Sequence, residues 1–126
     1  MGEHRFGFEK LVVYGEAKDL VREVYATAAG FPADERFGLT SQVTRAGVSV
    51  AANIAEGSSR VSLKEQAHFS QMAFGSLMEV LCLLDISREL GFIDDARMAR
   101  FRSQIESISS RLNALRRSQL QRGTIS

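Results

Sequence analysis

The sequence predicts an all-α protein, an antiparallel up-down four-helix bundle that forms a single domain over residues 1–126. Four stretches repeat their apolar residues with the period of an α-helix, and no stretch alternates as a half-buried strand does. The segments between these stretches are short, so consecutive helices are expected to be antiparallel neighbours. Apolar residues make up 44% of the chain and charged residues 25%, a balance typical of a folded soluble domain.

The first helix is expected over residues 8–29 and the second over residues 41–59. Apolar residues at steps of three and four line one face of each. They are Tyr14, Ala17, Val21, Val24 and Ala28 on the first helix, and Val43, Gly47, Val50 and Ile54 on the second. Pro32 follows the first helix, and the residue before a proline is biased away from helical geometry. Thr40 is the expected N-cap of the second helix.

The third helix is expected over residues 63–90 and the fourth over residues 95–121. Ser62 begins a capping box with the glutamate three residues later, and Gly91 suits the left-handed position after a helix end. Asp94 is the expected N-cap of the fourth helix. Six apolar residues of this helix keep a strict alternation of three and four: Met98, Phe101, Ile105, Ile108, Leu112 and Leu115. Such a narrow stripe favours helices that cross at about 20°.

The third helix carries more apolar surface than a peripheral helix of a monomeric bundle needs. Between residues 72 and 86 only Ser76, Glu79 and Asp85 interrupt an apolar sequence. A second copy of the chain is the simplest cover for the excess, so we expect a homo-oligomer. The alternative is that this helix lies at the centre of the monomer.

Polar residues form one stripe on each of the two middle helices. We predict that they build a structural hydrogen-bonded network, because buried polar groups must find partners. Its expected members are Gln42, Arg45, Ser49, Asn53, Glu56, Ser76 and Glu79. The competing interpretation is an active site, with Glu56 and Glu79 as paired carboxylates and His68 nearby.

Signatures of metal sites and of common enzymes are absent from the sequence. Di-metal bundles use two Glu-x-x-His elements, whereas this chain has one, Glu65 to His68, and its other histidine is His4. A glycine-rich phosphate loop, a Cys/His ligand set and a Gly-x-Ser-x-Gly elbow are also lacking. We therefore expect a non-catalytic protein with no cofactor, no metal and no small-molecule substrate.

The single cysteine and the absence of targeting patterns favour the cytoplasm. Cys82 cannot form an intrachain disulfide, and its leucine neighbours indicate a small core residue rather than a nucleophile. The start of the chain has no apolar core for a signal peptide, and no run approaches the roughly 18 uncharged apolar residues of a membrane span. No membrane association is expected.

The charge is divided unevenly along a chain whose net charge is +1. Residues 1–95 hold nine Lys and Arg against 14 Asp and Glu, whereas residues 96–126 hold seven Arg and a single acid. Four of these arginines share one face of the fourth helix: Arg97, Arg100, Arg111 and Arg122. Such a track could follow the phosphates of RNA or DNA.

The alternative partners for these arginines are acids of the same chain. Glu9, Glu16 and Glu23 follow one another at seven-residue spacing on the first helix. They could pair with the fourth-helix arginines within a subunit or between subunits, and such pairs can set the orientation of helices. Internal pairing and nucleic-acid binding both remain open at this point.

Several segments resemble a known family of helical-bundle proteins. The clearest is Asn53-Ile54-Ala55-Glu56-Gly57, followed by Gly75-Ser76 and Glu79. Further matching segments are Phe8 to Tyr14, Val24-Tyr25, Phe31-Pro32, Phe37 to Gln42, Arg45-Ala46, Ser49-Val50, Ala73-Phe74 and Leu90-Gly91. On these segments the chain resembles the four-helix-bundle proteins named after the intervening sequences of bacterial 23S ribosomal RNA genes.

This resemblance implies an up-down bundle that assembles as a ring, with a homopentamer expected. It implies no established enzymatic activity. A protein similar to this family, the accessory variability determinant of diversity-generating retroelements, is a basic pentamer that binds nucleic acid and a reverse transcriptase. By this resemblance RNA, DNA or a nucleic-acid enzyme are the expected alternative partners.

Overall fold

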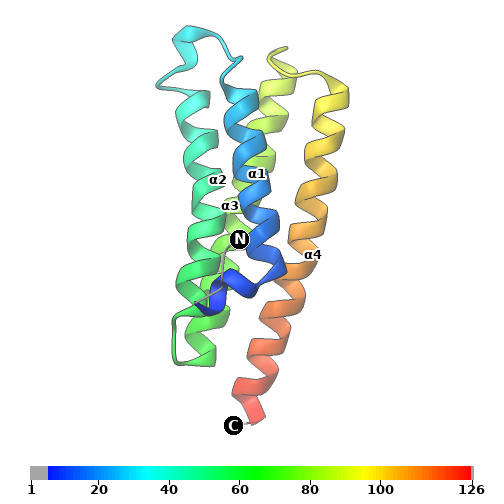
Figure 1. Cartoon of the computed structure of the whole chain (residues 1–126). Helices are drawn as coiled ribbons and strands as arrows, with labels where there is room; N and C mark the ends of the chain where they lie inside the picture. Colours follow the sequence, from blue (N-terminus) through cyan, green and yellow to red (C-terminus); the bar gives the residue numbers. More distant parts are fainter. Residues whose placement is uncertain (1–5, 126) are drawn as a thin grey trace.

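The computed structural model describes residues 6–125, with side chains as far as Arg122, and is all-α over these residues (Figure 1). Four long helices are joined by short connections, and two short 3-10 turns precede the first and second helices. The long helices are α1 (Val12–Ala28), α2 (Leu39–Ser58), α3 (Leu63–Glu89) and α4 (Asp95–Ile125), and the turns are η1 (Gly7–Lys10) and η2 (Ala33–Glu35). The predicted number and order of the helices are confirmed.

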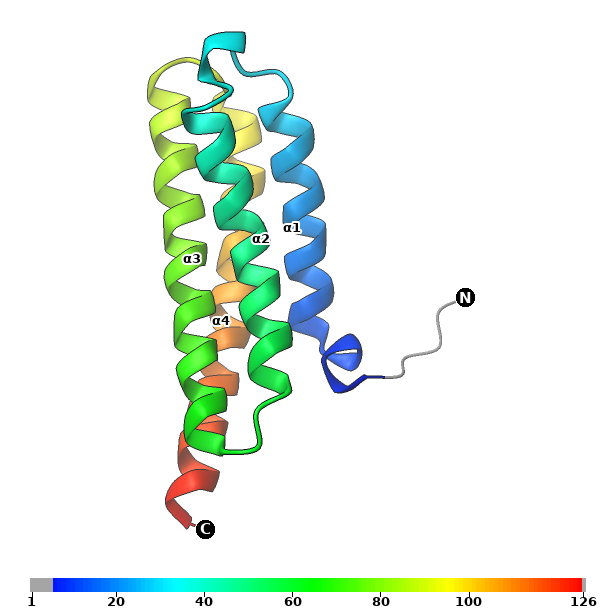
Figure 2. The same ribbon diagram turned by 90° about the vertical axis from the view of Figure 1, so that its left-hand side faces the viewer.

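The helices stand side by side in chain order, as an up-down bundle requires (Figures 1 and 2). Over the described residues, α2 packs on α1 and α3, and α4 packs on α3 and α1. The pairs α1–α3 and α2–α4 make no comparable contact, so each of these pairs lies across a diagonal of the bundle. This arrangement places the exposed side of α3 away from α1.

Three helix ends follow the sequence-based expectations. The hydroxyl of Ser62 accepts a hydrogen bond from the backbone N–H of Glu65 (3.2 Å) at the start of α3, which is one half of the predicted capping box. The carboxylate of Asp94 accepts one from the backbone N–H of Arg97 (2.7 Å) at the start of α4. Gly91 adopts a φ of 81° after α3, and this left-handed conformation is one that glycine adopts at little cost.

Three helix boundaries differ from the predictions, and each difference has a local reason. The first helix begins at Val12 because the preceding turn η1 ends in an extended residue, Leu11. Thr40 is not the N-cap of α2, since that helix begins at Leu39, whose N–H donates to the Glu35 carboxylate (3.1 Å). The fourth helix continues to Ile125, so the glycine at position 123 does not end it.

The core is formed where the apolar stripes of the four helices meet. On α2 all four predicted core residues are buried, and on α4 five of the six are buried while Leu115 is half-buried. The buried stripe of α1 is shifted by one residue from the prediction at two places. It consists of Val13, Ala17, Leu20, Val24 and Ala28, with Tyr14 and Val21 half-buried beside it.

Helix α3 is buried on one side only. Its Ala73, Leu77, Val80 and Leu84 pack in the core, whereas only 33% of its most apolar 18-residue window is buried. Among the described residues α3 is the one helix long and apolar enough, by length and composition, to span a membrane, although Glu79 and Asp85 interrupt its apolar run as the sequence indicated. A buried core helix passes the same test, and α3 packs against α2 and α4 while its outer side stays exposed.

Candidate interaction surfaces

Three members of the predicted polar network join α2 to α3. The hydroxyls of Ser49 and Ser76 share a hydrogen bond of 2.8 Å across the two helices. The amide of Asn53 donates to the Ser49 carbonyl (2.9 Å) and to the Ser49 hydroxyl (3.1 Å). All three side chains are half-buried, so this group holds the register of α2 against α3.

The other four members of the predicted network lie outside this hydrogen-bonded group. Gln42, Arg45, Glu56 and Glu79 are exposed. Glu56 accepts a hydrogen bond from Arg60 one turn further along the chain (2.8 Å) instead of reaching α3. The network therefore contains three of the seven predicted residues, because on α2 only Ser49 and Asn53 lie on the side that faces α3.

A glycine allows the end of α2 to approach α3 closely. A Cβ atom added at Gly57 would lie 2.7 Å from the Cβ of Phe69, closer than real contacts allow. The guanidinium of Arg60 covers the same phenyl ring at 4.7 Å, and the Gln66 amide donates to the Arg60 carbonyl (2.8 Å). Sequence reasoning noted the Asn-Ile-Ala-Glu-Gly segment without finding this contact, which depends on a residue of another helix.

The side chains of the alternative active site do not come together. Glu56 follows Ser49 by seven residues on α2, and Glu79 follows Ser76 by three residues on α3. Because the two helices are antiparallel, these steps lead toward opposite ends of the bundle. The two carboxylates are thus separated by about 15 Å along the bundle axis. His68 is exposed, with its ring at the edge of the Phe69 ring.

No group of three metal-ligating side chains occurs within the described part of the chain. His4, the second histidine considered above, lies outside the described residues. Cys82 is exposed on α3, so the prediction of a core cysteine is wrong for the single chain. Its leucine neighbours Leu83 and Leu84 are buried because they are turned about 100° and 200° around the helix from Cys82, toward the core.

Two of the four α4 arginines pair with acids of α1. Arg111 Nε lies 2.7 Å from Glu16 Oε1, and the other oxygen of that carboxylate accepts a hydrogen bond from Ser107 (2.5 Å). Arg97 Nη1 lies 3.4 Å from Glu23 Oε2 and donates to the Thr27 hydroxyl (3.1 Å). Internal pairing is thus present at Glu16 and Glu23. The third acid of the seven-residue spacing, Glu9, lies in η1 before α1, where its carboxylate accepts a hydrogen bond from the Phe6 N–H (2.7 Å).

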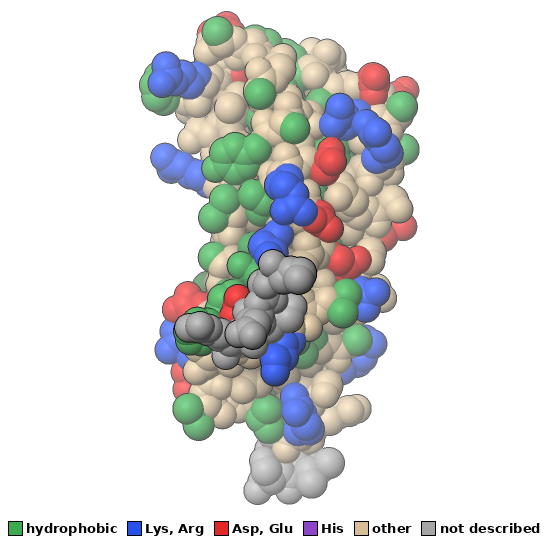
Figure 3. Space-filling model, viewed as in Figure 1, with side chains coloured by type: hydrophobic (Ala, Val, Ile, Leu, Met, Phe, Trp, Pro, Cys, Tyr) green, Lys and Arg blue, Asp and Glu red, His purple; other side chains and the backbone are tan. Residues whose placement is uncertain are grey.

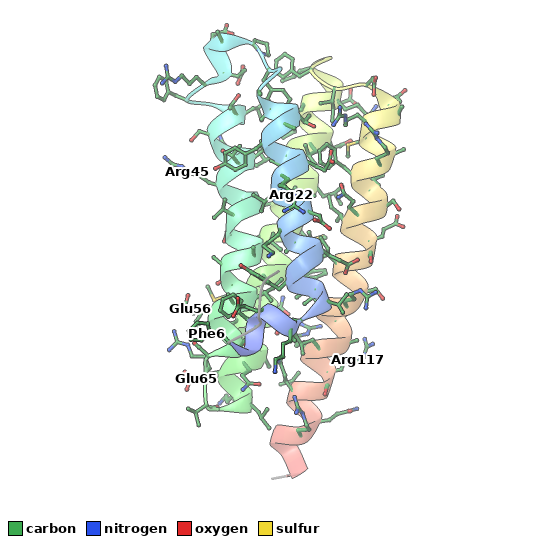
Figure 4. All side chains as sticks on the ribbon, in the orientation of Figure 1. Phe6, Arg22, Arg45, Glu56, Glu65 and Arg117 are labelled. Carbon is green, nitrogen blue, oxygen red and sulfur yellow. The ribbon has the colours of Figure 1, made fainter. Side chains whose placement is uncertain are left out.

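The remaining basic residues of α4 do not form one continuous track. Arg100 is exposed on the α1 side, and the Arg122 Nε donates to the Ser118 carbonyl of its own helix (3.4 Å). Arg116 donates to Gln71 of α3. Arg117 is exposed near the end of α4, which extends past the turn between α2 and α3 (Figures 2 and 4). Arg102 is exposed as well, so accessible positive charge lies both near the start of α4 and toward its C-terminal end.

Arg88 forms an ion cluster at the other end of the bundle. Its guanidinium contacts Asp85 (3.2 Å), Glu89 (2.9 Å) and Asp95 (3.6 Å). The hydrogen bond to Asp85 is the main cause that raises the pKa of Arg88 above its usual value, with the charge of Glu89 adding to it. The cluster stabilises the connection between α3 and α4 and leaves Arg88 charged at any physiological pH.

A buried polar contact between α3 and α4 was not anticipated from the sequence. The Ser70 hydroxyl donates to the Gln119 side-chain oxygen at 2.9 Å, and both residues are buried. Gln119 continues the apolar stripe of α4 at a step of four after Leu115. The periodicity itself was therefore the signal that could have found it, although the residue type is polar.

Comparisons with known proteins agree with this bundle. The family model described as "23S rRNA-intervening sequence protein" matches residues 9–114. A crystal structure of a protein of unknown function from the S23 ribosomal protein family of Bacteroides thetaiotaomicron is similar, with a TM-score of 0.74 and 18% sequence identity. The match covers 82% of this chain and 97% of that one, and at this identity it supports the fold alone. No curated protein matches the sequence. Because the family model covers most of its length, the chain belongs to the 23S rRNA-intervening sequence protein family.

Proposed function

We propose that this protein is a non-catalytic, cytoplasmic scaffold or interaction protein that works as a homo-oligomer, assembled as a ring of five copies. The observation that carries the proposal is the outer side of α3. Met72 and Ile86 are each 42% exposed, Leu90 is 56% exposed, and Cys82 lies among them. Exposed apolar surface of this length on one helix is typical of a contact with another chain.

The mass of the protein in solution tests self-association. Light scattering or sedimentation at micromolar concentration should give a multiple of the 13.9 kDa chain mass, with five copies as the expected number. A different multiple would correct the ring size and keep the oligomer. A stable particle of 13.9 kDa would refute the proposal.

A second candidate function is nucleic-acid binding as an accessory protein, and the projecting end of α4 favours it. Arg122 is exposed close to that end and Arg117 is exposed beside the start of α3, and α4 carries no acid after Glu106 (Figure 4). A ring of parallel bundles would repeat this positive end in every subunit. Phosphate contacts would then involve these two residues more than Arg97 and Arg111, whose charges are already compensated by acids of α1.

Gel-shift titrations with RNA and DNA at two salt concentrations test this candidate. Replacing Arg117 and Arg122 by Gln should reduce the affinity at low salt at least about tenfold, because each lost phosphate contact weakens binding. The matched control replaces Arg97 and Arg111 by Gln and should change the affinity less. Absence of binding by the unaltered protein at low salt would remove the candidate.

A further inference from the structure

Eight exposed residues form one stripe along the outer side of α3, which we call the α3 ridge. They recur at steps of three and four along almost the whole helix: Glu65, His68, Met72, Gly75, Glu79, Cys82, Ile86 and Glu89. Phe74, Met78 and Leu81 lie half-buried beside the stripe. Strict alternation on an exposed face is the pattern by which one helix packs into another surface.

The bundle also carries a groove between α1 and α2, which we call the α1/α2 groove. It has a volume of about 450 Å³. Its lining residues are Phe8, Tyr14, Lys18, Val21, Arg22, Val48, Ala51, Ala52 and Ala55. Small residues on α2 form one wall, and apolar side chains gather between the two helices with basic side chains beside them (Figure 3).

The charges of the two surfaces are complementary. The α3 ridge holds three glutamates and no lysine or arginine, whereas the lining of the groove includes two basic residues and no acid. Arg45 extends the basic character along the outer edge of α2 (Figure 4). Within the described chain Glu79 and Arg45 have no ion-pair partner, and Lys18 contacts only the ring of Tyr14 (5.0 Å), whereas Arg22 pairs with the exposed Asp19 of its own helix.

The heights of these charges along the bundle also match. The Ser49–Ser76 hydrogen bond aligns α3 with α2, and Gly47 lies beside Val21 and Val24 of α1. By this alignment Glu79 lies within about one helical turn, roughly 5 Å, of the height of Arg22 and Arg45. Rotation about an axis parallel to the helices keeps every height unchanged, so a second copy would present its Glu79 at the level of these arginines.

We infer that the α3 ridge of one copy docks into the α1/α2 groove of a second copy. The inference rests on the proposed self-association and assigns the two surfaces that meet. Because α1 and α3 lie across a diagonal of the bundle, ridge and groove belong to different sides of the molecule. The contact is therefore head-to-tail, and a contact of this kind closes into a ring when its rotation allows. Glu79 faces Arg22 and Arg45 of the neighbour, and Met72 lies against the small residues of α2.

Cross-linking through the single cysteine tests which surfaces meet. Tyr25 continues the groove stripe of α1 one turn after Val21, is 53% exposed, and lies on the far side of the bundle from Cys82. In Tyr25→Cys, a short bismaleimide should join neighbouring subunits into covalent multimers through Cys82. The matched control Ala26→Cys has the same height but faces the start of α4, so it should yield no multimers. The unaltered protein should yield none either, since its Cys82 residues face grooves and not one another.

Charge exchange gives an independent test. Glu79→Arg should raise the dissociation constant of the oligomer at least about tenfold, because it places like charges together. Adding Arg45→Glu should restore most of the affinity. The control Asp34→Arg makes the same charge change in η2, away from both surfaces, and should leave the dissociation constant within about twofold. Circular dichroism would verify that each variant remains helical.

The outcomes distinguish a failure of the inferred docking from a failure of the proposed self-association. Multimers from Tyr25→Cys together with rescue by Arg45→Glu support the docking. An oligomer whose unaltered Cys82 residues cross-link to each other has a two-fold α3–α3 contact, which overturns the docking and leaves self-association intact. An oligomer insensitive to Glu79→Arg and lacking cross-links in Tyr25→Cys likewise overturns only the docking. A monomer at micromolar concentration overturns both.

Discussion

The α2–α3 interface and the α1–α4 interface are built on different physical principles. Between α2 and α3, a glycine and two serines allow the backbones to approach, and the contact is made by short side chains. Between α1 and α4, long charged side chains reach across the surface, as Arg111 does to Glu16 and Arg97 does to Glu23. Close packing fixes one register, whereas exposed ion pairs stabilise an orientation by smaller and salt-dependent amounts.

The difference also explains the distribution of basic residues on α4. Half of the four arginines that share a face in the sequence are used to hold α1, through its Glu16 and Glu23. The acidic body and the basic fourth helix are therefore partly complementary within one chain. Among the described residues Arg100 and Arg102, nearer the start of α4, also have no acid in contact, and the proposed nucleic-acid contact is assigned to the C-terminal end because α4 carries no acid after Glu106.

Gly57→Ala should break the α2–α3 interface and give the largest effect. The added Cβ would lie 2.7 Å from the Cβ of Phe69, so one helix must shift. We expect a loss of about 2 kcal/mol in the free energy of unfolding, which is typical of overpacking. Gly15→Ala is the matched control, since a Cβ there meets no atom within 4 Å, and it should gain about 0.5–1 kcal/mol. Urea unfolding at one fixed protein concentration measures both, and equal behaviour of the two variants would contradict the close approach.

Asn53→Ala should have an intermediate effect on the free energy of unfolding, and it sharpens the comparison between the two interfaces. The half-buried amide donates to Ser49, so its removal should cost about 1 kcal/mol of the free energy of unfolding. Glu56→Ala, one turn away, removes an exposed pair with Arg60 and should cost no more than about 0.5 kcal/mol. Thermal melts read out the difference, and a larger loss for Glu56→Ala would restore that carboxylate to the structural network.

Arg111→Gln should have the smallest effect and should depend on salt. The pair with Glu16 is half-exposed, with side-chain exposures of 51% and 27%, so about 0.5–1 kcal/mol is expected at low ionic strength. High salt should reduce this loss, because exposed charges are screened, while the loss in Asn53→Ala should stay unchanged. The control Arg100→Gln, with no acid in contact, should be neutral at both salt concentrations. A salt-independent loss in Arg111→Gln would show that packing of the side chain matters more than its charge.

Much of the fold could be predicted from the sequence because it is encoded locally. The stripe from Met98 to Leu112 is buried as its periodicity predicted, and the caps at Ser62 and Asp94 form with residues three positions away. The candidate sites were less predictable. Glu56 and Glu79 lie on neighbouring helices in the sequence, but the register of α2 against α3 separates them, and no local pattern contains that register.

The sequence by itself determined the helices, their approximate ends and the faces that form the core, since hydrogen bonding and apolar period act over three or four residues. Only the tertiary structure decided which side chains meet across the bundle: Ser49 with Ser76, Glu16 with Arg111, and Phe69 with the backbone at Gly57. It also decided that Cys82 and Met72 lie outside the single chain's core. The physical reason is that these pairings depend on the rotation and height of each helix, which the packing of all four helices sets together.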